Sequence, residues 1–170
     1  MKKTLSLVLV FIYVFCLVGC ESTFLPKKMP TDFSFSLTWG THGTSSYDSK
    51  TGKLVKTAHA TNPEDYIAYH ELSNEEKDRI YEYIRTLNPD KYPDIYNPNE
   101  GMMDSTPMTL VLTVYANGSE KTIKAEGIVY SYNSNNLKGK KFLSTCEAIT
   151  MMLILTEEWK SLPDYEFYYQ

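Results

Sequence analysis

The sequence is poor in the residues that usually carry chemistry. It has three cysteines and three histidines among 170 residues. It contains no glycine-rich phosphate loop and no serine-hydrolase signature. His70-Glu71 begins like a zinc-binding H-E-x-x-H motif, but Asn74 stands where the second histidine belongs. We therefore expect neither a cofactor nor a metal site, and we expect the chain not to be an enzyme.

Positive charge is also scarce. The 17 lysines and arginines are outnumbered by 21 aspartates and glutamates, which gives a net charge of −4 at neutral pH. Nucleic-acid phosphates require a basic surface, so we expect no nucleic-acid partner. The same balance disfavours electrostatic attachment of the whole domain to anionic lipid.

A long hydrophobic run occurs only at the N-terminus. Lys2 and Lys3 precede an apolar stretch over residues 5–18, and this stretch ends on Leu17-Val18-Gly19-Cys20. The stretch is shorter than the about 20 residues that a transmembrane helix needs, and its positive charge lies only before it. An ordinary secretory signal is the closer alternative, but such a signal would not need a cysteine at its cleavage position.

These residues resemble the signal peptide and lipobox of a bacterial lipoprotein. The resemblance implies that residues 1–19 are removed and that Cys20 carries a diacylglycerol and further acyl chains such as palmitate. It also implies export and a lipid anchor at the extracytoplasmic face of the cell membrane. The remaining sequence is similar to small uncharacterised lipoproteins of Gram-positive bacteria, a resemblance that implies no particular activity.

Removal of 19 residues from 170 leaves 151, which suits one domain with one core. Without Lys2 and Lys3, 15 basic residues face 21 acidic ones, so the net charge becomes −6. Cys146 is then the one unmodified cysteine, so the domain cannot form an internal disulfide and depends on core burial. Because Cys146 lies in an apolar pattern, we expect a buried, inert thiol.

The chain divides into an N-terminal tether and a domain. Residues 20–32 contain Pro26 and Pro30 and show no periodicity, which favours a flexible tether. Twelve extended residues would reach at most about 40 Å. Residues 33–170 are expected to form one domain. Alternating or β-prone patterns predict strands over 33–39, 53–58, 66–71, 108–116 and 119–126, with 127–132 extending the sheet and 165–169 at an edge.

Two helices complete the expected domain. Ser73 and Glu76 form a capping box before a helix that ends at Asn88-Pro89. The second helix carries an apolar stripe from Phe142 onward and ends at Leu162-Pro163, but its start is ambiguous because Ser144 and Glu147 form another capping box. Asn117-Gly118 predicts a type I′ turn between two strands.

The expected fold class is α+β. Strands grouped before each helix favour an antiparallel sheet of about five to six strands with two helices on one face, in the order ββ(β)αββ(β)α. Residues 40–52, 89–107 and 131–141 are expected to be loops. The acidic and amide side chains of the middle loop could supply oxygen ligands to calcium. These residues are Asp90, Asp94, Asn97, Asn99 and Glu100. They lack the spacing of an EF-hand, so a solvated loop is favoured.

Tyrosines on polar loops suggest a binding surface. Such side chains provide contact area at low entropic cost. The candidate ligand-binding residues are Tyr47, Tyr92, Tyr96, Tyr130 and Tyr132, and the loops expected to recognise the ligand are 41–52, 88–107 and 131–139. The alternative is that these rings close the edges of a small core.

The function expected from these features is a non-catalytic binding or interaction module, with a protein, peptide or glycan as its ligand. One alternative is an extracytoplasmic hydrolase whose site combines His42 or His70 with Asp48 or Glu71. Another is an inhibitor of an extracellular enzyme. The sequence leaves the ligand and the oligomeric state open.

Overall fold

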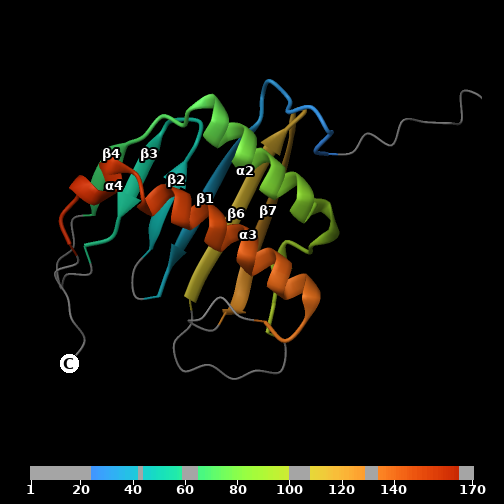
Figure 1. Ribbon diagram of the computed structural model, residues 1–170. Coiled ribbons are helices and arrows are strands. Elements are labelled where there is room, and N and C mark those ends of the chain that lie inside the picture. The colour runs from blue at the N-terminus through green and yellow to red at the C-terminus, as the bar shows by residue number, and fades with distance from the viewer. Residues whose placement is uncertain (1–23, 42–43, 59–64, 100–107, 129–133, 165–170) are drawn as a thin grey trace, which may run out of the picture.

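The computed structural model describes residues 24–41, 44–58, 65–99, 108–128 and 134–164 (Figure 1). Within these ranges seven strands form one sheet, in the order β4-β3-β2-β1-β6-β7-β5. The strands are β1 (Ser34–Gly40), β2 (Ser45–Asp48), β3 (Lys53–Lys56), β4 (Tyr66–Tyr69), β5 (Ile95–Tyr96), β6 (Met108–Ala116) and β7 (Ser119–Ile128). The helices are α2 (Asn74–Leu87), the short 3-10 helix η1 (Pro89–Lys91), α3 (Leu137–Ile154) and α4 (Glu157–Ser161).

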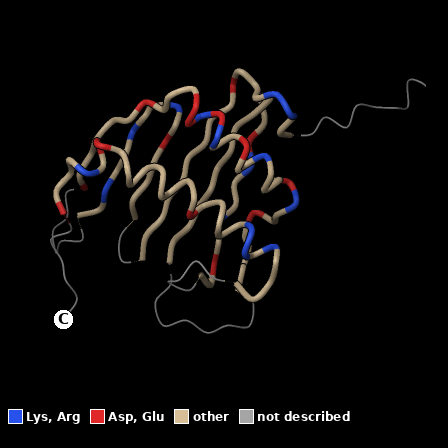
Figure 2. The backbone as a smooth tube through the Cα atoms, in the orientation of Figure 1, with Lys and Arg blue, Asp and Glu red and all other residues tan. Residues whose placement is uncertain are grey.

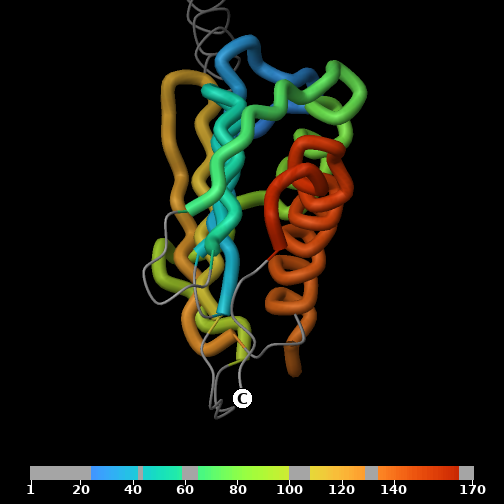
Figure 3. Tube along the Cα trace, turned by 90° about the vertical axis from the view of Figure 1, so that its left-hand side faces the viewer, coloured from blue at the N-terminus to red at the C-terminus, as the bar shows by residue number. Residues whose placement is uncertain are grey.

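The helices and the sheet form two layers. Figure 3 shows α2 and α3 on one side of the sheet. Side chains of β1 alternate, so that Phe35, Leu37 and Trp39 are buried beneath the helices. Phe142 and Ile149 of α3 are fully buried against this face. The α+β class predicted from the sequence is therefore confirmed.

The capping box, the helix end and the tight turn that the sequence predicts are all present in the structure. The Ser73 hydroxyl accepts from the backbone N–H of Glu76 at 3.3 Å, and the Glu76 carboxylate accepts from the Ser73 backbone N–H at 2.8 Å. The helix ends at Asn88, which has a left-handed φ of 61°. Asn117 and Gly118 have φ values of 52° and 70°, as a type I′ turn requires.

The predicted details of the sheet are wrong, because the sheet is mixed and larger. The expected loop over 40–52 contains β2, which pairs with both β1 and β3. The expected loop over 89–107 contains η1 and β5, and β5 runs parallel to β7. Both strands are too short for an alternating pattern to reveal them, so pairing with long neighbours determines their structure.

The C-terminal helix also differs from the prediction, since it becomes two helices. It starts at Leu137, where the Asn136 side chain accepts from the Gly139 backbone N–H at 2.7 Å, and so occupies part of the expected loop 131–139. Thr156 then caps α4 through its hydroxyl, which accepts from the Trp159 N–H at 3.2 Å. The domain thus has three α-helices among the described residues, not two. The expected strands at 129–132 and 165–169 lie outside those residues.

From Phe24 onward, the predicted tether packs on the domain. Leu25 is 8% exposed, and Met29 contacts the core. The Tyr81 hydroxyl donates to the Pro26 carbonyl at 2.5 Å. Leu25 is buried in the core, and Phe24 and Met29 are partly buried against it, so residues 24–32, which we call the N-terminal strap, pack on the domain.

Asp32 fastens the end of the strap to the turn between β6 and β7. Its two carboxylate oxygens accept from the backbone N–H groups of Asn117 at 2.9 Å and Gly118 at 2.7 Å. The Asn117 side chain donates in turn to the Phe24 carbonyl at 3.1 Å. Both ends of the strap therefore touch one turn.

Charged residues avoid the middle of the sheet. Figure 2 shows them along α2 and in the connections, while β1 and β6 carry none. No helix in the described part of the chain has both the length and the apolar character that crossing a membrane requires.

We predict that Asp32→Ala destabilises the domain in a pH-dependent way. Hydrogen bonds from Gly118 and Asn117 lower the pKa of Asp32 below its ordinary value of 3.8. A carboxyl with a lowered pKa stabilises the fold above its ordinary pKa, and this contribution disappears as the pH falls through the lowered value. The melting temperatures of wild type and variant should therefore differ at pH 7 and converge as the pH falls through the lowered pKa of Asp32. Asp90→Ala, which removes an exposed aspartate elsewhere, is the control; a constant difference across pH would contradict the prediction.

Candidate functional site

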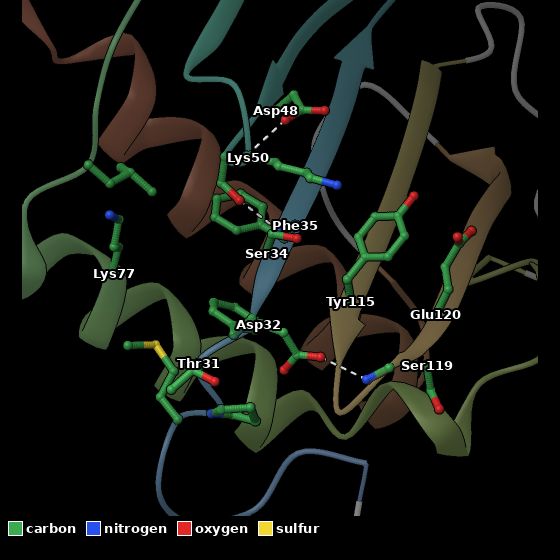
Figure 4. Close-up of a pocket in the computed structure, with 16 residues that line it drawn as sticks. Thr31, Asp32, Ser34, Phe35, Asp48, Lys50, Lys77, Tyr115, Ser119 and Glu120 are labelled. Carbon is green, nitrogen blue, oxygen red and sulfur yellow. Dashed lines mark hydrogen bonds between the residues drawn. The ribbon is translucent and has the colours of Figure 1, made fainter.

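A cavity of about 1030 Å³ lies where the N-terminal strap meets the end of the sheet. Four parts of the chain line it: residues 29–35, the turn 48–50 after β2, the start of α2 with Leu72, and the β6–β7 hairpin (Figure 4). Its volume is at the upper end of the range for small-ligand sites, about 300–1,000 Å³. The cavity is therefore large enough for a small molecule or for the side chains of a larger partner.

Part of the lining is apolar. Phe35 and Leu72 are 2% and 4% exposed and belong to the core. Phe33 packs edge-on against Tyr81 with 4.8 Å between ring centroids. Met29 contributes from the strap. Of these side chains, Met29 and Phe33 are only partly buried and offer a surface for an uncharged part of a ligand.

The carboxylates at the cavity have partners within the protein. Asp32 holds the β6–β7 turn through both oxygens. Asp48 accepts from the backbone N–H groups of Lys50 at 2.8 Å and Thr51 at 2.9 Å. Glu120 accepts a hydrogen bond from the Tyr115 hydroxyl, which raises the pKa of Tyr115. The acidic groups therefore serve the local structure.

Two lysines also line the cavity, and they differ from these carboxylates in their partners. Lys50 follows β2, whereas Lys77 lies in the first turns of α2. Among the described residues, neither ammonium group has a carboxylate at ion-pair distance, in contrast with Lys121, which lies 2.5 Å from Asp94. Figure 4 shows the Lys50 side chain extending over β1 on the side of Tyr115. The cavity lining therefore carries charges of both signs, with the carboxylates of Asp32, Asp48 and Glu120 beside the two lysines.

The tyrosines predicted to bind ligand do not line this cavity. Tyr47 and Tyr92 are 1% and 3% exposed, and their hydroxyls donate to the carbonyls of His70 at 2.9 Å and Lys138 at 3.1 Å. Burial raises the pKa of Tyr92 to about 12. Tyr96 packs edge-on against Tyr92 with centroids 5.1 Å apart. Tyr47 and Tyr92 close core edges, as the alternative held, and they lack the exposure that the binding prediction required. Tyr96 packs against the core but is only partly buried.

Tyr130 and Tyr132 lie outside the described residues. The tyrosine at the cavity is Tyr115, which is 41% exposed and sits on β6. The sequence analysis missed it, and it also missed Asp32, Lys50 and Lys77. Each of these is an ordinary surface residue in its local pattern, and only the Asn117-Gly118 turn signalled that a hairpin end lies here.

The structure brings two of the predicted binding loops together, at the other end of the sheet. The Pro98 carbonyl accepts from the Ser134 hydroxyl at 2.5 Å and from the Asn136 side chain at 3.0 Å. Asn99 is fully buried nearby, and its side-chain amide makes no hydrogen bond to any of the described residues. Asp94, expected among the calcium ligands, pairs with Lys121 instead. Within the described residues, no three His, Cys, Asp or Glu side chains form a group that could hold a metal ion.

The histidine proposed for a hydrolase has different partners from those expected. His70 Nδ1 lies 3.1 Å from Glu158 Oε2, and Nε2 lies 3.6 Å from Glu76 Oε1. Asp48 and Glu71 are not its partners, and His42 lies outside the described residues. Burial raises the pKa of Glu76. Hydrogen bonds from Ser73 and the proximity of His70 lower the pKa by more than burial raises it, so the net shift is downward.

This arrangement connects α4 with the start of α2. Among the described residues, no serine, threonine or tyrosine hydroxyl hydrogen-bonds to either ring nitrogen of His70. A base without a nucleophile in reach does not form the pair that covalent hydrolysis requires. His70 also does not line the cavity.

No protein-family model matches this chain, and no curated protein matches it. Inferences about function therefore rest on the geometry of the domain and on the N-terminal sequence.

We predict that Cys146 resists modification in the folded protein. Its side chain is fully buried in the core, as the sequence suggested, and burial raises the pKa of the thiol. The reactive thiolate is therefore scarce at neutral pH. N-ethylmaleimide should modify Cys146 on the order of a hundredfold or more slowly in the native state than in denaturant, because access requires opening of the core. Peptide mass mapping measures this, and rapid modification of native protein would refute it.

Proposed function

We propose that the chain is a lipoprotein held by acylated Cys20 at the extracytoplasmic face of the membrane. The lipobox residues and the preceding signal support this proposal. The strap adds a geometric consequence, because it is already packed on the domain at Phe24. The four residues from Cys20 to Phe24 span at most about 14 Å, not the 40 Å of a free tether. The domain would then sit close to the membrane, with the strap side toward it.

The domain itself we propose to be a non-catalytic binding module whose ligand occupies the cavity. The single observation that carries this is the cavity, whose lining combines apolar side chains with polar groups from several segments. Its described lining contains neither histidine nor cysteine, although hydroxyl, carboxylate and ammonium groups are present. Since residues 29–35 form part of the wall, the site would open beside the anchor, where a ligand at the membrane surface could reach it.

Replacement of the lipidated cysteine tests the anchor. Cys20→Ser removes the acceptor for diacylglycerol, and acyl chains contribute about 0.8 kcal/mol per buried methylene to membrane affinity. The variant should therefore leave the membrane fraction almost completely, as measured by detergent phase partitioning and immunoblotting of cell fractions. Cys146→Ser is the matched control and should stay in the membrane. Unchanged partitioning of the Cys20 variant would rule out the anchor.

Filling the cavity tests the binding module. Ser34 lines the cavity, whereas Ser36 lies two residues further along the same strand and outside the lining. A small ligand should copurify with the wild-type protein from its own envelope. Ser34→Trp should abolish binding of this ligand, and Ser36→Trp should still bind it. Native mass spectrometry of the full chain measures both.

Both tryptophan variants should melt within about 4 °C of wild type, because they replace residues outside the core. The same bound mass on Ser34→Trp, Ser36→Trp and wild type would show that the cavity is not the binding site.

A further inference from the structure

We infer that the outer edge of β4 is a strand-addition site and that its occupant is the segment 165–170 of this chain, paired parallel to β4. The inference starts from the backbone groups that β4 leaves open and from the place where Asp164 lies. It is independent of the cavity, so it stands or falls separately from the proposed function.

Strand β4 is the last strand of the described sheet and pairs only with β3. One step beyond the β3–β4 register, the His70 N–H donates to the Gly52 carbonyl at 2.8 Å. Hydrogen-bonded and non-hydrogen-bonded pairs alternate along an antiparallel ladder. Ile67 and Tyr69 therefore occupy non-hydrogen-bonded positions, and their backbone N–H and C=O groups point away from β3.

These outward groups form an open edge. Within the described residues, nothing hydrogen-bonds to the backbone N–H or C=O of Ile67 or Tyr69, and their side chains are 50% and 67% exposed. The strand also has no charged residue and no proline, which commonly protect an edge from pairing. An extended peptide backbone has the donors and acceptors that match such an edge.

The chain arrives at this edge after α4, which Figure 1 shows beside β4. The Lys56 ammonium lies 3.7 Å from the Asp164 carboxylate and donates to the Leu162 carbonyl at 3.5 Å. Lys56 is the register partner of Tyr66, the first residue of β4. Asp164 is therefore held near the beginning of β4, and residues 165–170 start from there.

The path of α4 fixes the direction of the added strand. Glu158 lies 3.1 Å from the His70 ring, beyond the end of β4, whereas Leu162 contacts Lys56 at its beginning. A segment that leaves Asp164 along the edge thus runs back toward His70, parallel to β4. At about 3.3 Å per residue, six residues span about 20 Å and the four-residue strand about 13 Å, so the segment is long enough.

The sequence of the segment fits a strand at this position. Tyr165, Phe167 and Tyr169 alternate with other residues, and aromatic side chains favour strands. The alternation would place all three rings on one face of the added strand. On the face that carries Ile67 and Tyr69, they would cover the two exposed side chains of β4, and burial of apolar surface is favourable.

Hydrogen exchange of single amides tests the pairing. We compare the full chain with a variant that ends at Asp164, both in a neutral maltoside detergent, by mass spectrometry with electron-transfer fragmentation. The Ile67 and Tyr69 amides should exchange about tenfold or more faster in the shortened variant, because they lose their acceptors. Ala68, whose amide faces β3, is the internal control and should change by less than about twofold.

A proline variant tests the pairing without shortening the chain. With Phe167 beside β4 on the face of Ile67, the next residue, Tyr168, directs its backbone N–H toward β4. Tyr168→Pro removes this donor, whereas Tyr168→Val keeps it and favours a strand. The Ile67 and Tyr69 amides should exchange about tenfold faster in the proline variant than in the valine variant, which should resemble wild type.

Two results would overturn the inference. Equally fast exchange of Ile67 and Tyr69 in the full chain and in the variant that ends at Asp164 would show that residues 165–170 do not pair with β4. Slow exchange in both would show that another segment or a second copy covers the edge. If shortening loosens all of β4, so that Ala68 also exchanges faster, the proline and valine variants decide between pairing and its absence. Neither result affects the cavity or the lipid anchor.

Discussion

The rest of the structure depends on the carboxylate of Asp32 and the two backbone N–H groups that it holds. This contact joins Asp32, two residues before β1, to Gly118 in the turn between β6 and β7, 86 positions away. Because β1 and β6 are neighbours at the centre of the sheet, the contact determines where the strap leaves the domain. It thereby shapes one wall of the cavity and, if Cys20 is acylated, brings that wall close to the membrane.

The charges at the cavity come from separate segments of the chain. Asp32 and Asp48 are hydrogen-bonded by backbone amides, and Glu120 by the Tyr115 hydroxyl. Hydrogen bonds from these neutral groups stabilise the carboxylates in their charged form and do not remove the charge. With Lys50 and Lys77, the lining carries charges of both signs, and a count over the whole sequence does not show that these groups lie together.

The abundant aromatic residues serve stability in much of this domain. Without a disulfide, the two layers are held by side-chain packing, to which Tyr47, Tyr92 and the Trp39–Trp159 pair contribute at the core margins. A tyrosine can end a core because its hydroxyl reaches a carbonyl at the boundary, as both buried tyrosines do. Their enrichment therefore described how a small core is closed, and it was a weak indicator of a binding surface.

The sequence by itself determined the elements whose signals are local and long: the alternating strand β1, the capped helix α2 and the β6–β7 hairpin with its Asn117-Gly118 turn. It also determined the pattern at Cys20 that motivates the anchor. It could not reveal β2 and β5, which owe their structure to neighbouring strands, or the packing of the strap. The cavity was decided only by the tertiary structure, because Asp32, Lys50, Lys77 and Tyr115 come from separate segments. These residues are far apart in the sequence, and they meet only when the sheet and α2 have packed.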